Sequence, residues 1–322
     1  MADHAEDDDG DGIFVYRGGR APQHVTYVLI DTSLDEIEDN AFSGCQNLLT
    51  VETHDGIRKI GDHAFYYCKA LPRINLKSAV EIDNSAFCNC FHMESVEFGD
   101  RLETIGKYAF GWTSLTHLKL PTVITIGVGA FFTCQRLIAV ELSERLETIG
   151  IGAFQFCTQL QRISVPLKRD LFVYDHIDER YTQFYNCSQL TTVDLVGGIH
   201  KTVASFHMDI WRAEMIAEIN RINLVLPGTS TFEKADEIRQ WMELVIDRMD
   251  HYKAEHYRYV KEGITFLELA LWKAKLGEKE DHSEEGQTKK VKVDSESTRK
   301  ERRITCGADI VIKNVLPFLQ LE

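Results

Sequence analysis

The chain has 322 residues, of which 44% are hydrophobic and 27% charged, so it can bury a substantial core and is not a wholly disordered protein. Its formal net charge of −14 disfavours broad nucleic-acid binding, because phosphate contacts need concentrated positive charge. No apolar run approaches the roughly 18 residues of a membrane span, so we expect no membrane partner.

The first twelve residues are predicted to form an acidic disordered tail. They include six acidic residues and lack the apolar stretch of a secretory signal. We therefore expect a cytoplasmic location, with a nuclear one as the alternative.

From residue 37 onward the chain repeats one pattern six times. An isoleucine is followed four residues later by alanine and five residues later by phenylalanine. These phenylalanines are Phe42, Phe65, Phe87, Phe110, Phe131 and Phe154, and a degenerate seventh copy has Phe184. Their spacings of 23, 22, 23, 21, 23 and 30 residues lie in the range where self-similarity indicates a solenoid.

Each copy continues into a short predicted strand. A cysteine and then a leucine or methionine follow phenylalanine by three and six residues, except after Phe110, and the segment then reads Leu-x-x-Val-x-Leu. Alternation with period two indicates a strand with one covered face. One strand cannot bury that face alone, so stacked copies should form a parallel sheet along a solenoid over residues 13–204.

The repeated pattern Ile-Gly-x-x-Ala-Phe-x-x-Cys-x-x-Leu-x-x-Val-x-Leu resembles the BspA-like leucine-rich repeat, with a period of about 23 residues, over residues 37–195. The resemblance implies a right-handed α/β solenoid with a parallel β-sheet on one face. It also implies a protein-binding scaffold without catalytic residues. This repeat class occurs on bacterial surfaces and in unicellular eukaryotes, and the expected location inside the cell favours the eukaryotic microbial type.

Six cysteines recur at the same position of the repeat: Cys45, Cys68, Cys90, Cys134, Cys157 and Cys187. A small apolar side chain suits this position, so we expect buried free thiols instead of disulfides. Cys88, Cys90 and His92 form a string that could begin a zinc site. Because Cys90 occupies a core position and no second pair follows at zinc spacing, we expect no metal and no cofactor.

The strand residues that face away from the core are predicted to align into columns across the stack. Solenoids bind partners through such columns, because a rigid backbone presents these side chains in fixed positions. The partner-binding candidates are Glu52, Arg73, Glu97, His117, Lys119, Glu141, Arg162 and Asp194. The alternative is that these positions are solvated strand surface.

A longer loop, residues 167–181, delays the seventh copy. Insertions in solenoids often contact partners. Phe172 and Tyr174 could be an exposed anchor for a partner or a plug of the local core, and we favour the plug.

Beyond residue 204 the apolar spacing becomes helical. Residues 205–276 are predicted to form a helical C-terminal cap over the exposed end of the solenoid. A helical partner-binding module is the alternative. His251 and His256 are five residues apart, which places them on different sides of a helix and disfavours a shared metal ion.

Two further segments complete the chain. Residues 277–304 are predicted to be a charged disordered linker. Two basic clusters within it resemble a bipartite nuclear import signal: Lys289, Lys290, Lys292, Arg299, Lys300, Arg302 and Arg303. Residues 305–322 are predicted to form an apolar helix that folds back onto the cap or docks on another protein.

Two functions follow from these observations. The sequence favours a non-catalytic adaptor that holds a protein partner, of unidentified kind, through the strand face and the 167–181 loop. No nucleophile elbow, phosphate loop or dinucleotide fingerprint appears, so an enzyme is not expected. The alternative is a nuclear, nucleic-acid-associated factor imported through the 289–303 clusters.

Overall fold

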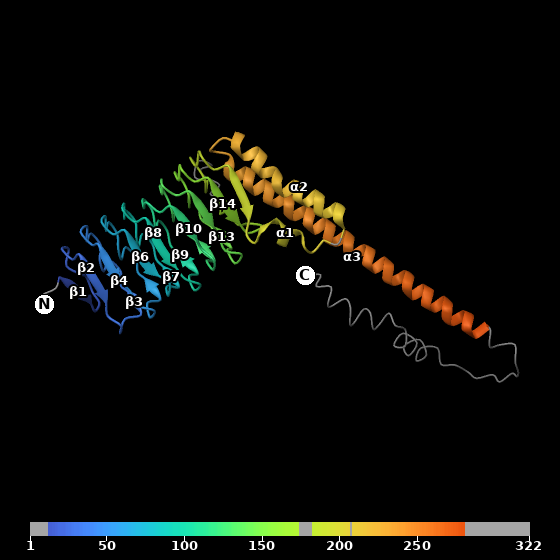
Figure 1. Ribbon diagram of the computed structural model, residues 1–322, viewed down its shortest axis with the longest axis horizontal. Helices are drawn as coiled ribbons and strands as arrows, with labels where there is room; N and C mark the ends of the chain where they lie inside the picture. The colour runs from blue at the N-terminus through green and yellow to red at the C-terminus, as the bar shows by residue number, and fades with distance from the viewer. Residues whose placement is uncertain (1–11, 174–181, 207, 281–322) are drawn as a thin grey trace. The chain divides into compact units, whose positions relative to one another are not determined.

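The computed structural model describes residues 12–173, 182–206 and 208–280 of the chain (Figure 1). The chain divides into two compact units, Met1–Ile246 and Asp247–Glu322. The first unit contains the stacked repeats and the helices that follow them. The division falls inside the last helix, whereas the sequence placed a boundary at residue 204.

The first unit is a parallel β-solenoid, as the repeat predicted. One strand of each turn lies on the same side of the stack, and neighbouring strands pair in parallel (Figure 1). They form three sheets, with the orders β1-β2-β4, β6-β8 and β10-β12-β14-β15. The bounds are β1 Ile13–Tyr16, β2 Tyr27–Ile30, β4 Thr50–Glu52, β6 Arg73–Leu76, β8 Ser95–Phe98, β10 His117–Lys119, β12 Ala139–Glu141, β14 Arg162–Val165 and β15 Thr192–Leu195.

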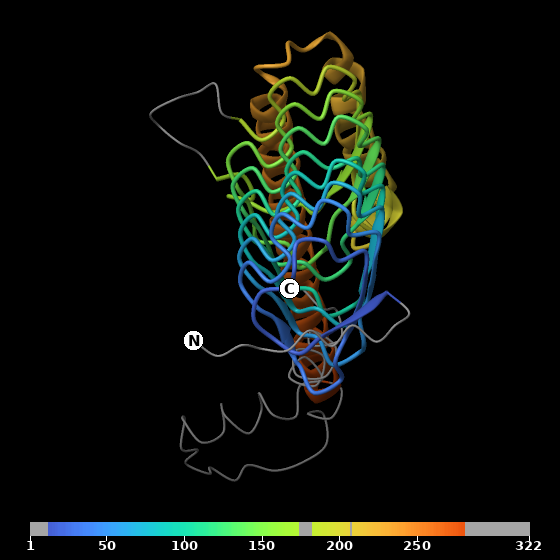
Figure 2. The ribbon, with the colours of Figure 1, turned by 90° about the vertical axis from the view of Figure 1, so that its left-hand side faces the viewer.

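A fourth sheet, which was not predicted from the sequence, runs along another side of the same stack. Each of its strands has two residues and ends on the repeated isoleucine. The six parallel strands are β3 Glu36–Ile37, β5 Lys59–Ile60, β7 Glu81–Ile82, β9 Thr104–Ile105, β11 Thr125–Ile126 and β13 Thr148–Ile149. In Figure 2 the stack is seen obliquely from the side of β1, and successive turns overlap, each displaced from the one before.

The repeated phenylalanines form one continuous column in the core. All seven side chains from Phe42 to Phe184 are fully buried. Successive ring centroids are 5.0 to 5.8 Å apart, and the planes differ by 11° or less. Tyr16 covers the N-terminal end of the column, 4.8 Å from Phe42. Offset aromatic pairs add about 0.5–1.5 kcal/mol each beyond their buried area, so the column stabilises every interface between turns.

The repeated cysteines are free and buried, which confirms the predicted thiol column for the described residues. Each thiol donates a weak hydrogen bond to a carbonyl of the preceding turn. From Cys68, Cys90 and Cys157 these bonds reach the repeated phenylalanine at Sγ···O distances of 3.1 to 3.2 Å. In the turn that lacks cysteine, the buried Thr113 occupies this position, and its hydroxyl donates to the Phe110 carbonyl of its own turn instead of to the preceding turn. This repeated position therefore holds a small side chain with a hydrogen-bond donor in all seven copies.

In four copies of the repeat a glycine follows the repeated isoleucine. A turn that requires left-handed backbone does not explain this glycine. Its backbone is not left-handed in any of the four copies that carry it. A Cβ atom on Gly106 would lie 2.6 Å from the Asp83 carbonyl carbon, and one on Gly150 would lie 2.5 Å from the Gly127 carbonyl carbon. Glycine is needed there because successive turns approach backbone to backbone.

Helices follow the last strand: α1 Gly198–Val203, α2 Asp209–Val225, the 3-10 turn η1 Leu226–Gly228 and α3 Lys234–Glu280. The Asn223 side chain of α2 pairs with the backbone of Val193 in β15, accepting from its N–H at 2.7 Å and donating to its carbonyl at 3.1 Å. The buried ammonium of Lys234 donates to the Leu190 carbonyl. These contacts cover a strand edge that would otherwise present unpaired backbone groups.

The second unit is described from Asp247 to Glu280, where α3 ends. The helix therefore continues four residues into the range 277–304 that was expected to be linker. Several large apolar side chains on this part of α3 are exposed, including Phe266 at 70% and Trp272 at 54%. Among the described residues, no helix is long and apolar enough to cross a membrane. The predicted 1–12 tail, except Gly12, and the predicted 305–322 helix lie outside the described residues.

Candidate functional site

The partner-binding candidates lie on the strand face, in the columns that the sequence predicted. The register pairs His117 with Ala139, Ala139 with Arg162, and Lys119 with Glu141. The other described pairs follow the same columns: Arg73 with Ser95, Asn75 with Glu97, and Ser164 with Asp194. Seven of the eight candidates are exposed, and Asp194 is half-buried. Their role in binding remains a prediction.

Several charges of the strand face are paired with one another. Lys119 lies 3.4 Å from Glu141, Arg162 forms an ion pair with Asp194, and Lys77 lies 2.8 Å from Glu97. The hydrogen bond from Lys77 lowers the pKa of the Glu97 carboxyl. Exposed pairs of this kind contribute about 0–1 kcal/mol each, so a partner could replace them at small cost.

The 167–181 loop is described only as far as Val173. Phe172 is buried, and its ring packs edge-on against Phe184 with centroids 5.7 Å apart. It therefore plugs the core and offers no anchor to a partner. Tyr174 lies outside the described residues, as do all the import-signal candidates from Lys289 to Arg303.

A second surface, which we call the turn face, is created by left-handed backbone in each turn. The second residue after the repeated phenylalanine has a positive φ in all seven copies, for example 62° at Tyr67, 57° at Trp112 and 60° at Phe156. This conformation is uncommon for bulky residues. Here it lets the backbone N–H of Trp112 donate to the Phe132 carbonyl of the next turn at 2.8 Å. The stack thus fixes side chains that point outward.

Aromatic residues occupy much of the turn face. Six of them form a continuous series of ring contacts, which we call the aromatic row: Tyr108, Trp112, Phe132, Phe156, Tyr185 and Phe232. From Trp112 onward the centroids are 4.8 to 5.5 Å apart. Every ring in the row is half-buried or exposed, and none belongs to the phenylalanine column of the core. A run of partly exposed aromatic side chains of this length indicates a binding surface.

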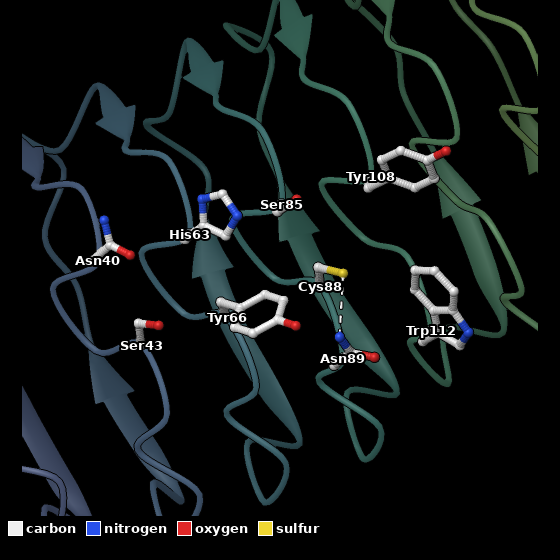
Figure 3. Close-up of a pocket in the computed structure, with 9 residues that line it drawn as sticks. All are labelled: Asn40, Ser43, His63, Tyr66, Ser85, Cys88, Asn89, Tyr108 and Trp112. Atoms are coloured by element: carbon white, nitrogen blue, oxygen red, sulfur yellow. Dashed lines mark hydrogen bonds between the residues drawn. The ribbon is translucent and has the colours of Figure 1, made fainter.

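A shallow groove lies at the N-terminal end of the aromatic row, with a volume of about 570 Å³. Figure 3 shows its lining residues, which come from four successive turns: Asn40, Ser43, His63, Tyr66, Ser85, Cys88, Asn89, Tyr108 and Trp112. The third of these turns contributes only the small side chains of Ser85, Cys88 and Asn89. The groove therefore lies where a turn with small side chains separates turns that carry aromatic side chains.

The sequence analysis missed the turn face because it looked for partners among the strand residues. The signal was present in the first and second positions after the repeated phenylalanine. Five of the seven copies carry an aromatic residue there: Tyr66 and Tyr67, Trp112, Phe132, Phe156 and Tyr185. From the sequence alone, the aromatic residues at these positions could equally be assigned to the core.

The chemistry of both surfaces suits binding. Burial raises the pKa of the Cys88 thiol, at the floor of the groove, to about 11, so this cysteine is a poor nucleophile at neutral pH. Within the described part of the chain, no three His, Cys, Asp or Glu side chains are grouped in a way that could hold a metal ion.

Comparison with solved structures finds bacterial leucine-rich repeat proteins. A protein from Bacteroides ovatus is 27% identical with a TM-score of 0.43, and the match covers 56% of this chain and 45% of that protein. A protein from T. pallidum is 26% identical with a TM-score of 0.38, covering 56% of this chain and 72% of the other. The chain thus spans less than half of the Bacteroides ovatus protein. No curated protein matches the chain.

The repeats themselves match a family model. The model describes a BspA type leucine rich repeat region, and six copies match over residues 22–122 and 80–207. These ranges together cover more than half of the 322 residues. The period, the buried Ile, Phe and Leu positions and the stacked parallel strands are the features that such a repeat requires. The chain belongs to the BspA-type leucine-rich repeat family.

Proposed function

We propose that this protein is a non-catalytic scaffold that binds a protein partner through the aromatic row of its turn face. Leucine-rich repeat proteins generally mediate protein–protein interaction or surface binding. The observation that carries the choice of surface is the continuous series of ring contacts from Tyr108 to Phe232.

Two properties of the row support this proposal. Tyrosine and tryptophan are enriched at the energetic centres of protein interfaces, since they bury much area and lose little conformational freedom. The row is held by a rigid stack, so ordering it on binding costs little. By contrast, the exposed ion pairs of the strand face contribute little energy, whether they are made within the chain or with a partner. Contact through the strand face is kept as the second proposal for the binding surface.

Paired variants test the choice between the two surfaces. Phe132→Ser with Phe156→Ser removes the middle of the row, and Glu97→Lys with Glu141→Lys reverses charge on the strand face. Tyr257→Ser, which removes an exposed aromatic side chain from α3, is the matched control. Each tagged protein would be used to capture partners from cells that produce it, followed by quantitative mass spectrometry.

We expect a protein captured by the intact chain and by the control to be lost with the row variant and retained with the strand-face variant. The opposite result would move the binding surface to the strand face. Equal capture by all four proteins would contradict both surfaces.

The nuclear alternative rests on the two basic clusters between Lys289 and Arg303. We propose its test independently of the scaffold, by fusing residues 286–304 to a fluorescent reporter. Accumulation of the reporter in nuclei would support import. An even distribution would contradict it and leave the cytoplasmic location as the proposal.

A further inference from the structure

The groove at the end of the aromatic row has the dimensions of a site for an extended ligand that follows the stack. Its lining runs from Asn40 in one turn to Trp112 three turns later. With about 4.8 Å between paired strands, this run is about 14 Å long. The aromatic side chains lie in the turns on either side of the small Ser85, Cys88 and Asn89 turn, with Tyr66 before it and Trp112 after it (Figure 3).

The spacing of these rings matches one kind of polypeptide. Two turns of the stack advance about 9.6 Å, given about 4.8 Å per turn. A polyproline II helix has three residues per turn and rises about 3.1 Å per residue, so every third residue recurs after about 9.3 Å. A polyproline II segment that lies along the stack would therefore present equivalent side chains first to Tyr66 and then to Tyr108 and Trp112.

The chemistry of the lining agrees with that match. No lining residue is an acid, a lysine or an arginine, so the groove suits a ligand without obligatory charge. Proline-rich segments dock in aromatic-lined grooves and leave their backbone carbonyls free to accept hydrogen bonds. The groove offers donors for those carbonyls. Among the described residues, none accepts a hydrogen bond from the Tyr66 or Tyr108 hydroxyl or from the Trp112 indole N–H.

We propose that the groove binds a proline-rich segment of a partner protein in the polyproline II conformation. The proposal rests on the protein-binding function above and names the ligand for one end of the same surface. At about 3.1 Å per residue, a 14 Å groove takes four to five residues. A sugar ring could also stack on these aromatic side chains. The lining has no carboxylate to receive paired sugar hydroxyls, and the 9.3 Å match favours the peptide.

Fluorescence polarisation with the full chain tests this proposal. The probe is fluorescein-labelled decaproline, with a labelled Gly-Ser decapeptide as the negative peptide and unlabelled cellohexaose as a competitor. We expect saturable binding of decaproline alone. Its affinity should change less than threefold between 50 and 500 mM salt, because no charged residue lines the groove.

Three variants locate the binding. Trp112→Ala and Tyr66→Ala should each weaken decaproline binding at least tenfold, whereas Tyr257→Ala should leave it unchanged. Cys88→Phe should abolish binding by filling the groove. The equivalent position carries Phe132 in a later turn, so the repeat accommodates this side chain without loss of fold. Thermal unfolding of each variant shows whether it is folded.

The outcomes separate this proposal from the proposed function. Absence of saturable decaproline binding, unchanged binding by a folded Cys88→Phe variant, or displacement by cellohexaose would each overturn the proline-rich ligand. None of these results affects the capture experiment with Phe132 and Phe156, which lie outside the groove. Loss of captured partner in that experiment together with intact decaproline binding would instead show two separate contacts on one face.

Discussion

At the scale of residues, the core consists of columns in which each side chain packs against its equivalents in both neighbouring turns. Phe110 shows this most clearly, since its ring lies between Phe87 at 5.1 Å and Phe131 at 5.5 Å, and Phe98 packs edge-on against it. Phe110→Ala would remove contacts to both neighbouring turns and leave a cavity. We expect the free energy of unfolding to fall by about 3–5 kcal/mol.

Urea denaturation followed by circular dichroism measures this loss. Tyr108→Ala in the same turn is the control, because its ring is 38% exposed and lies outside the core column. It should cost much less than Phe110→Ala. An unchanged unfolding midpoint for Phe110→Ala would contradict the position of this ring in the core.

The buried thiols give the stability a pH dependence. Burial raises the pKa of the Cys45 thiol to about 11 and that of Cys187 to about 12, whereas an unfolded cysteine ionises near pH 8.5. Above that pH the unfolded state loses thiol protons that the folded state keeps. The contribution of these thiols to the free energy of unfolding should therefore be constant below about pH 8 and fall as the pH rises toward 11.

The measurement is urea unfolding from pH 7 to pH 10.5. Cys187→Ala should reduce the slope above pH 8.5, even though it also lowers stability at pH 7. A slope that does not change in this variant would mean that the thiol at position 187 is not responsible.

At the scale of elements, the last strand is protected by one amide side chain. Asn223 satisfies both the N–H and the carbonyl of Val193, as a further strand would. Asn223→Leu keeps the approximate size and leaves both backbone groups without that partner. We expect a loss of about 1–3 kcal/mol in unfolding free energy, since an unsatisfied buried polar group costs this much.

The neighbouring residue supplies the control for this variant. Leu224 is 83% exposed on the same helix, so Leu224→Ala should change stability by less than about 0.5 kcal/mol. Both are measured by chemical denaturation. Hydrogen exchange at the Val193 amide should accelerate in Asn223→Leu alone, and equal exchange in the two variants would contradict the role of Asn223.

The elements differ in how far the sequence could predict them. The long strands and their columns were predictable, because the repeated core positions fix the register and alternate with exposed ones. The strands that end on isoleucine, such as β9, have two residues and are too short to show alternation. The aromatic row was missed because it includes residues such as Phe132, which directly follows the buried Phe131, and the left-handed backbone at the next residue, Thr133, gives no signal in the sequence. That conformation follows from stacking and not from local sequence.

At the scale of the whole molecule, the position where the cap ends is testable. A solenoid needs its exposed apolar end covered. In the helical region, the buried apolar residues of α3 are Ala235, Ile238, Trp241, Met242, Val245 and Tyr252. Beyond Tyr252 the described side chains are half-buried or exposed. The first unit ends at Ile246, so the part of α3 that this unit needs for its stability should lie before residue 252.

Two truncations test this end point. A chain of residues 1–252 keeps every buried apolar residue of α3, so its urea midpoint should match that of the full chain. A chain of residues 1–233 loses all of α3, including the buried Trp241 ring, and should unfold at much lower urea or aggregate. A lower midpoint for residues 1–252 would mean that the distal part of α3 also stabilises the repeats. The sequence boundary at 276 would then be the better estimate of where the cap ends.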